Sequence, residues 1–126
     1  MMPVARLSIA ILLLIGVGCS QDPHRAEEGA KWLQQRYLFK PFGDVGEISK
    51  IYVSDASLIR IEVMLTRQES ADAISAKSLM MRSLIAKYAC PRKAAKLWEI
   101  VGEDVTIRID LKTESAKVSS AICKPE

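Results

Sequence analysis

The sequence has little of the chemistry that most enzymes need. Its 126 residues include a single histidine, His24, and its three cysteines show no CxxC spacing. Nucleophilic catalysis by a Ser-His or Cys-His pair requires an imidazole that its surroundings hold rigidly. His24 lies only a few residues after an N-terminal apolar leader, and we interpret it as an exposed histidine at the start of a helix. Because metal sites also need several such ligands close together, the sequence favours neither an enzyme nor a bound metal or other cofactor.

A strong excess of one charge is also absent. Residues 1–18 contain one basic side chain, so the formal net charge of +3 falls to +2 without them. Nucleic-acid-binding surfaces usually show a large, clustered basic excess, and we expect no nucleic acid partner. The "GDVG" stretch at residues 43–46 has too few glycines for a phosphate-binding loop. The basic residues Arg92, Lys93 and Lys96 fit a solvated turn better than a site for anionic lipid or an acidic partner.

No apolar run is long enough for a typical membrane-spanning helix. Such a helix needs roughly 20 apolar residues, whereas the run over residues 7–17 has 11. With one basic residue before it and small residues after it, this run predicts a signal peptide over residues 1–18. The lipoprotein signal peptidase requires a small residue immediately before a cysteine. Gly18 meets that requirement, so Cys19 is predicted to be the lipidated first residue of the mature chain.

The number of cysteines supports lipidation. If Cys19 carries lipid, Cys90 and Cys123 remain as a pair, and an exported protein meets an oxidising compartment in which thiols pair. We therefore predict one structural disulfide between Cys90 and Cys123. The alternative is cleavage by the ordinary signal peptidase, which the small residues around Cys19 also permit. Gly16 departs from the aliphatic residue that lipoprotein signals prefer three positions before the cysteine.

The rest of the chain has the length of one domain. Residues 19–24 are predicted to form the lipidated tether and residues 25–126 a single periplasmic domain, because this length allows one compact core and not two. Alternation of apolar and polar residues predicts strands. The clearest covers residues 105–112, and further strands are predicted over residues 48–54, 58–65, 97–101 and 117–123. Polar outer positions on these strands indicate an antiparallel sheet with one covered face.

Two helices are predicted to cover that face. The first begins at Pro23 and ends before Pro41, with apolar residues three and four positions apart. The second runs from Thr66 to Ala89 and opens with Thr66 and Glu69 at the spacing of a capping box. Its broad apolar face includes Ile74, Met80, Met81, Leu84, Ile85 and Tyr88. The predicted class is α+β: an antiparallel sheet of four to five strands, two main helices packed on one face, and one disulfide.

A partner-binding surface is the remaining functional prediction. An exposed sheet edge can accept a strand, and a groove beside helices can accept a partner helix. The side chains that we expect either to line such a groove or to belong to the core are the aromatic residues Trp32, Phe39, Phe42 and Trp98.

The layout of the chain resembles the α/β-type pilotin lipoproteins of bacterial type II secretion. The shared order is an acylated cysteine, a first helix, the strand pair "KIYVSDASLIRIEVML", a helix ending in cysteine, "LWEIVGEDVTIRIDLKT", and a last strand ending in cysteine. The resemblance implies a lipoprotein on the periplasmic side of the outer membrane. It would bind the C-terminal segment of secretin subunits and help them to reach that membrane and assemble. Cys19 would carry the lipid, Ser20 suits outer-membrane sorting, and Cys90 and Cys123 match the family's paired cysteines.

Two other classes remain open at this point. A periplasmic inhibitor or exclusion protein would share the tether and the disulfide but would present a protruding polar loop, for which "KPFGDVGE" at residues 40–47 is the candidate. A structural envelope lipoprotein would need no dedicated ligand.

Overall fold

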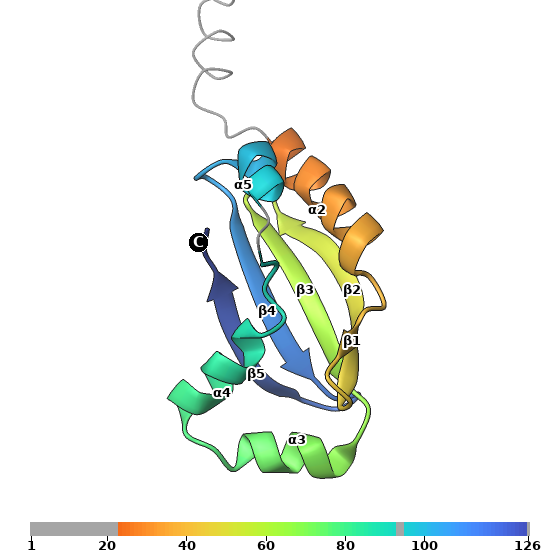
Figure 1. Cartoon of the computed structure of the whole chain (residues 1–126). Helices are drawn as coiled ribbons and strands as arrows, with labels where there is room; N and C mark the ends of the chain where they lie inside the picture. Colours follow the sequence, from red (N-terminus) through yellow and green to blue (C-terminus); the bar gives the residue numbers. More distant parts are fainter. Residues whose placement is uncertain (1–22, 93–94, 126) are drawn as a thin grey trace, which may run out of the picture.

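The computed structural model describes residues 23–92 and 95–125, so the predicted signal peptide and Cys19 lie outside the described residues. The described residues form four helices and a single five-stranded sheet with the strand order β1-β2-β3-β4-β5 (Figure 1). In chain order the elements are α2 (Pro23–Tyr37), β1 (Pro41–Phe42), β2 (Gly46–Asp55), β3 (Leu58–Leu65), α3 (Gln68–Ser75), α4 (Leu79–Lys87), α5 (Ala95–Val101), β4 (Thr106–Lys112) and β5 (Lys117–Cys123). The predicted α+β class is confirmed.

The sheet is mixed, which corrects the prediction of a purely antiparallel sheet. Strands β2 and β3 form the expected antiparallel hairpin, and β4 and β5 form another. Strands β3 and β4, however, run parallel, with Ile61 opposite Ile109. A parallel pair needs a crossover connection of a dozen or more residues, and α3, α4 and α5 supply it. The alternation of apolar residues predicts the strands but carries no information on their direction.

The long helix predicted from Thr66 to Ala89 is two helices. Ser78 is the N-cap of α4, and its Oγ accepts a hydrogen bond from the Met81 backbone N–H at 3.2 Å. Serine is favoured at N-cap positions because its hydroxyl oxygen can accept a hydrogen bond from a backbone N–H that has no partner within the helix. The predicted capping box is absent, since Arg67 is the N-cap of α3 and the Thr66 hydroxyl donates to the Val45 carbonyl instead.

Residues 97–101, predicted as a strand, belong to helix α5. Leu97 and Val101 are four residues apart and both are fully buried, which is the spacing of one helical face. Helix α5 packs on α2 at Gly29, where an added Cβ would lie 2.3 Å from Val101 Cγ1. The absence of a side chain at Gly29 therefore allows the two helices to approach closely.

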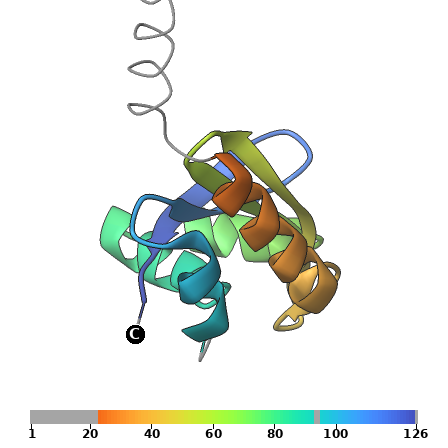
Figure 2. The same cartoon turned by 90° about the horizontal axis from the view of Figure 1, so that it is seen from above.

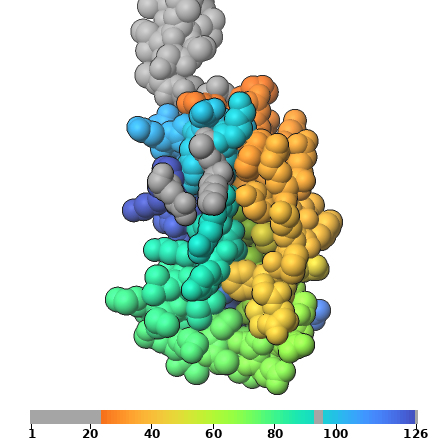
Figure 3. Space-filling view, in the orientation of Figure 1, coloured from red at the N-terminus to blue at the C-terminus, as the bar shows by residue number. Residues whose placement is uncertain are grey.

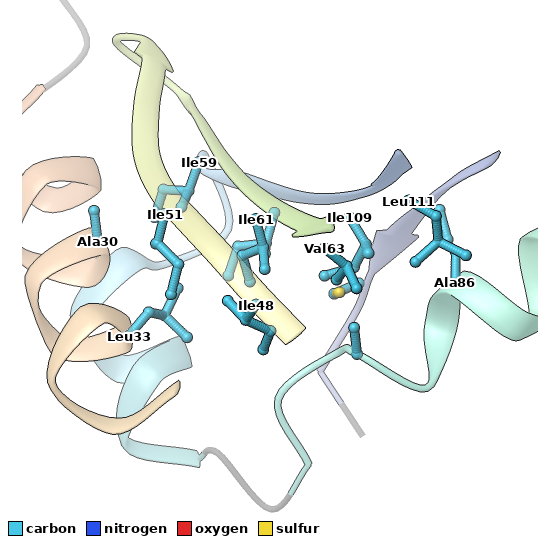
Figure 4. Close-up of a cluster of buried hydrophobic side chains, with 14 of the residues drawn as sticks. Ala30, Leu33, Ile48, Ile51, Ile59, Ile61, Val63, Ala86, Ile109 and Leu111 are labelled. Carbon is cyan, nitrogen blue, oxygen red and sulfur yellow. The ribbon is translucent and has the colours of Figure 1, made fainter. Parts of the chain in front are cut away.

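The helices lie on one side of the sheet (Figure 2), and the core fills the space between them. Alternate residues of β3 and β4 point into this core together with Leu33 of α2, as Figure 4 shows for Ile59, Ile61 and Ile109. Burial of a side chain of this size contributes roughly 1.5–3 kcal/mol. Among the described residues, none of the helices has the length and apolar character needed to cross a bilayer.

The predicted disulfide is confirmed. Cys90 and Cys123 are bonded with an S–S distance of 2.09 Å. The bond ties the chain just after α4 to the last residue of β5, so it fixes α4 beside the final strand of the sheet.

Candidate functional site

The face of the sheet away from the helices carries an ion-pair network centred on Asp110. This carboxylate is only 6% exposed and accepts hydrogen bonds from Arg60 Nη1 at 3.0 Å and Arg108 Nε at 3.1 Å. Lys117 Nζ lies 3.4 Å from the same carboxylate. Burial acts to raise the pKa of Asp110, but the hydrogen bond from Arg60 and the charges of Lys117 and Arg108 outweigh it, so the pKa lies below its usual value.

Glu62 forms the second half of this network. Its carboxylate accepts hydrogen bonds from the Tyr52 hydroxyl at 2.7 Å and from Lys112 Nζ at 3.3 Å. Burial opposes ionisation of Glu62, yet these two hydrogen bonds hold the pKa of Glu62 below its usual value. The hydrogen bond between Tyr52 and Glu62 also raises the pKa of Tyr52. A hollow of about 280 Å³ lies over the network. Since each cation here lies beside one of the two carboxylates, we assign the network a structural role.

Helix α4 presents a row of large apolar side chains to solvent. Leu79, Met80 and Tyr88 are 77%, 74% and 69% exposed, and Met81 and Leu84 are also exposed. We call Met80, Met81, Leu84 and the C-cap residue Tyr88 the α4 stripe, because they fall within about 100° of one another around the helix. Leu79 is exposed at the first turn, on the side of Ala86. Figure 3 shows α4 at the surface of the molecule.

The opposite side of α4 explains why the stripe faces outward. Ala86 and Ala89 are buried and turn toward the sheet (Figure 4 shows Ala86 near Leu111). These small side chains let the helix backbone approach the sheet closely. The sequence grouped Met80, Leu84 and Tyr88 with Ile74 on one helix face, but the break at Ser78 separates them, and only Ile74 of these four is buried.

A cationic hollow of about 350 Å³ lies at the end of the stripe. It is lined by Lys87, Cys90, Pro91, Arg92, Ile122 and Lys124. The Arg92 guanidinium also lies 5.6 Å from the centre of the Tyr88 ring, which connects the hollow to the α4 stripe. A second hollow, of about 470 Å³, shares Ile122 and Lys124 with the first and is lined further by Trp98.

The four aromatic residues singled out in the sequence have different surroundings. Trp98 lines the second hollow, beside Ile122. Trp32 is half-buried and lies 6.2 Å from Tyr37 between ring centres. Phe42 is partly buried against the core, while Phe39 is largely exposed, with a φ of 66°. Only Trp98 of these four is placed by the structure beside the cationic hollow.

Two further sequence features can now be located. His24 is exposed on the first turn of α2, with Glu27 and Glu28 within 4.0 Å. The segment over residues 40–47 is held to the sheet, because β1 pairs with β2 and the Ile48 N–H donates to the Lys40 carbonyl at 2.9 Å. Across residues 23–92 and 95–125, no group of three or more His, Cys, Asp or Glu side chains is arranged to hold a metal ion.

Comparison of the chain with protein-family models, with curated proteins and with solved structures finds no match.

The α4 stripe and the cationic hollow were not identified as a site from the sequence, although one signal was present. Residues 73–98 contain six Lys or Arg residues and not a single Asp or Glu. This basic, methionine-containing stretch is amphipathic, and basic amphipathic helices are common at binding surfaces. Its apolar residues were instead assigned to the core.

Proposed function

We propose that this chain is a lipid-anchored, pilotin-like binding module on the periplasmic side of the outer membrane. It binds the C-terminal segment of secretin subunits and helps the secretin of a type II secretion system to reach that membrane or assemble there. The proposal assigns no catalytic step to the chain. The observation that carries it is the exposed α4 stripe, because contiguous apolar patches on soluble domains mark sites of interaction.

The chemistry of the stripe suits a short protein segment. An amphipathic helix can place its apolar side chains in a groove, with anchors three and four residues apart. Met80 and Met81 add flexible, polarisable side chains, which adapt to the shape of a partner. The Cys90–Cys123 disulfide is consistent with an exported protein, since such bonds persist in oxidising compartments. The choice of a secretin segment as the partner rests on the resemblance of the chain's layout to pilotins.

Isothermal titration calorimetry tests the proposal. We would express residues 20–126, which include every described residue, in the oxidised form and titrate the C-terminal segment of the secretin from the same organism. We expect saturable binding with a Kd on the order of 1 µM or tighter. The double substitution Met80→Ser/Leu84→Ser should weaken binding by about tenfold or more, because it removes two apolar anchors.

Phe39→Ser serves as the matched control. The sequence made Phe39 a groove candidate, but this exposed side chain belongs neither to the α4 stripe nor to the lining of the cationic hollow, so the proposal assigns it no contact. It should leave the affinity unchanged. Absence of binding to a folded, oxidised domain would refute the proposal, and equal losses in the two variants would refute the assignment to the α4 stripe.

A further inference from the structure

Among the described residues, cationic side chains gather on the outer face of the sheet and in the cationic hollow, and the two regions differ in how these charges are paired. On the outer face of the sheet, Arg60, Arg108 and Lys117 all lie within 3.4 Å of the Asp110 carboxylate. Lys112 lies 3.3 Å from Glu62. Each of these four cations therefore lies within 3.4 Å of a carboxylate.

The cations of the cationic hollow lack such pairing within the part of the chain that the structure describes. Lys87, Arg92 and Lys124 contribute three positive charges, and none of the described residues that line the hollow is acidic. Within residues 23–92 and 95–125, none of these three side chains forms an ion pair, and the Arg92 guanidinium lies 5.6 Å from the centre of the Tyr88 ring. Like charges gathered in one hollow repel one another, and an anionic group placed among them would be attracted by all three.

The α4 stripe continues directly into this hollow. Tyr88 ends the stripe and lies beneath Arg92, while Ile122 lines the hollow from the sheet. A ligand that fits both parts needs apolar side chains along one side and carboxylates beside them. Resting on the function proposed above, we propose that the partner segment is an acidic amphipathic helix: its apolar side chains cover the α4 stripe, and a Glu or Asp carboxylate enters the hollow between Lys87, Arg92 and Lys124.

The observations favour a protein helix over an anionic membrane surface. The basic region is concave, whereas a bilayer offers a broad surface that cannot fill a hollow of about 350 Å³. The hollow also adjoins the α4 stripe, so a single helix could cover the apolar side chains and place a carboxylate among the cations.

Two designed helical peptides of about 18 residues test the inference with residues 20–126 of this chain. Both carry leucines at the same helical positions, and their polar positions are Glu in one and Lys in the other. We expect the acidic peptide to bind about tenfold tighter or more at low salt. That advantage should shrink at high salt, because ionic strength screens exposed charges.

Charge reversal locates the effect. The variant Lys87→Glu/Arg92→Glu/Lys124→Glu should lose the preference for the acidic peptide. The control Lys31→Glu/Lys40→Glu/Arg67→Glu changes the net charge equally, at exposed positions outside the hollow, and should keep the preference. Circular dichroism melting shows that each variant is folded.

Equal affinity for the two peptides, or equal losses in the two charge-reversal variants, would overturn the inference. Stronger binding to vesicles of anionic phospholipid than to the acidic peptide would also overturn it, in favour of a membrane surface. The calorimetric titration with the secretin segment separates these failures from that of the proposed function. If that segment binds while the designed peptides show no charge preference, the proposed function survives and the acidic partner is wrong.

Discussion

At the scale of single residues, Asp110 holds the outer face of the sheet together. Arg60 and Arg108 are direct neighbours on parallel strands, and two like charges in that position would repel without the carboxylate between them. We expect Asp110→Asn to lower the free energy of unfolding by about 2 kcal/mol, since it removes charged hydrogen bonds. Urea unfolding measures this loss. Asp44→Asn, at an exposed residue, should change stability little, and comparable losses in both variants would contradict this role.

Asp110 and Glu62 also make the stability of the fold depend on pH in the acid range. The pKa values of Asp110 and Glu62 are lowered in the folded state. Their stabilising contribution is therefore complete above the unfolded values near pH 4 and is lost as the pH falls through the lower folded values. Unfolding free energies measured from pH 7 to pH 2 should show this acid-induced loss in the wild type and a smaller loss in Asp110→Asn. Identical pH profiles would contradict the account.

Gly29 provides a second test at the residue scale. An exchange of glycine for alanine in a helix usually stabilises by about 1 kcal/mol. At Gly29 the added Cβ would lie 2.3 Å from Val101 Cγ1 and 3.1 Å from Ile59 Cδ1. We therefore expect Gly29→Ala to destabilise by roughly 1–2 kcal/mol, because overpacking outweighs the gain in helix propensity. Gln35→Ala, on an exposed position of α2, is the control, and a stabilised Gly29→Ala protein would show that α5 can move away.

At the scale of elements, the disulfide holds α4 against β5. It closes a separation of 33 residues, which corresponds to about 3–4 kcal/mol in the chain-entropy model. The variant Cys90→Ala/Cys123→Ala should lose stability of this order in urea unfolding. It should also bind the secretin segment more weakly, because the cationic hollow is built on both sides of this bond. Unchanged stability and affinity would contradict the role given to the disulfide.

The strands were predictable and the connections between them were not. Alternation in β3 and β4 reports which side of each strand is buried, and the structure agrees at Ile59, Ile61 and Ile107. Strand direction depends on the end of the sheet at which the intervening helices bring the chain back. This is set by tertiary packing and not by the local sequence. The same holds for α5, whose apolar residues fit a strand or a helix until the contact with Gly29 is known.

The candidate site was hidden in the sequence for a related reason. An apolar helix face predicts that other apolar groups pack on it. It does not indicate whether these groups belong to the same chain or to a partner. Ile74 is covered by the core, whereas Met80 and Leu84 are not, because α3 ends at Ser75 and the chain starts a separate helix after Ser78. Trp98 lines a hollow, and its role in binding stays a prediction.

At the scale of the whole molecule, the two edges of the sheet differ. The backbone of β2 is engaged beyond its short pairing with β1, since the Ile51 carbonyl accepts from Gln34 Nε2 at 2.7 Å and the Ile48 carbonyl accepts from the Phe39 N–H at 2.7 Å. Strand β5 is the last strand at the other edge, and it lies next to α4 and the cationic hollow. The binding features therefore collect on one side of the domain.

The most direct test of the central claim is to map the binding surface by NMR. Amide chemical shifts of residues 20–126 in the oxidised form would be followed while the secretin C-terminal segment is added. The account predicts that the largest changes fall on the α4 stripe and on Ile122 and Lys124. Changes centred on Asp110 and the outer face of the sheet, or no changes at saturating peptide, would contradict it.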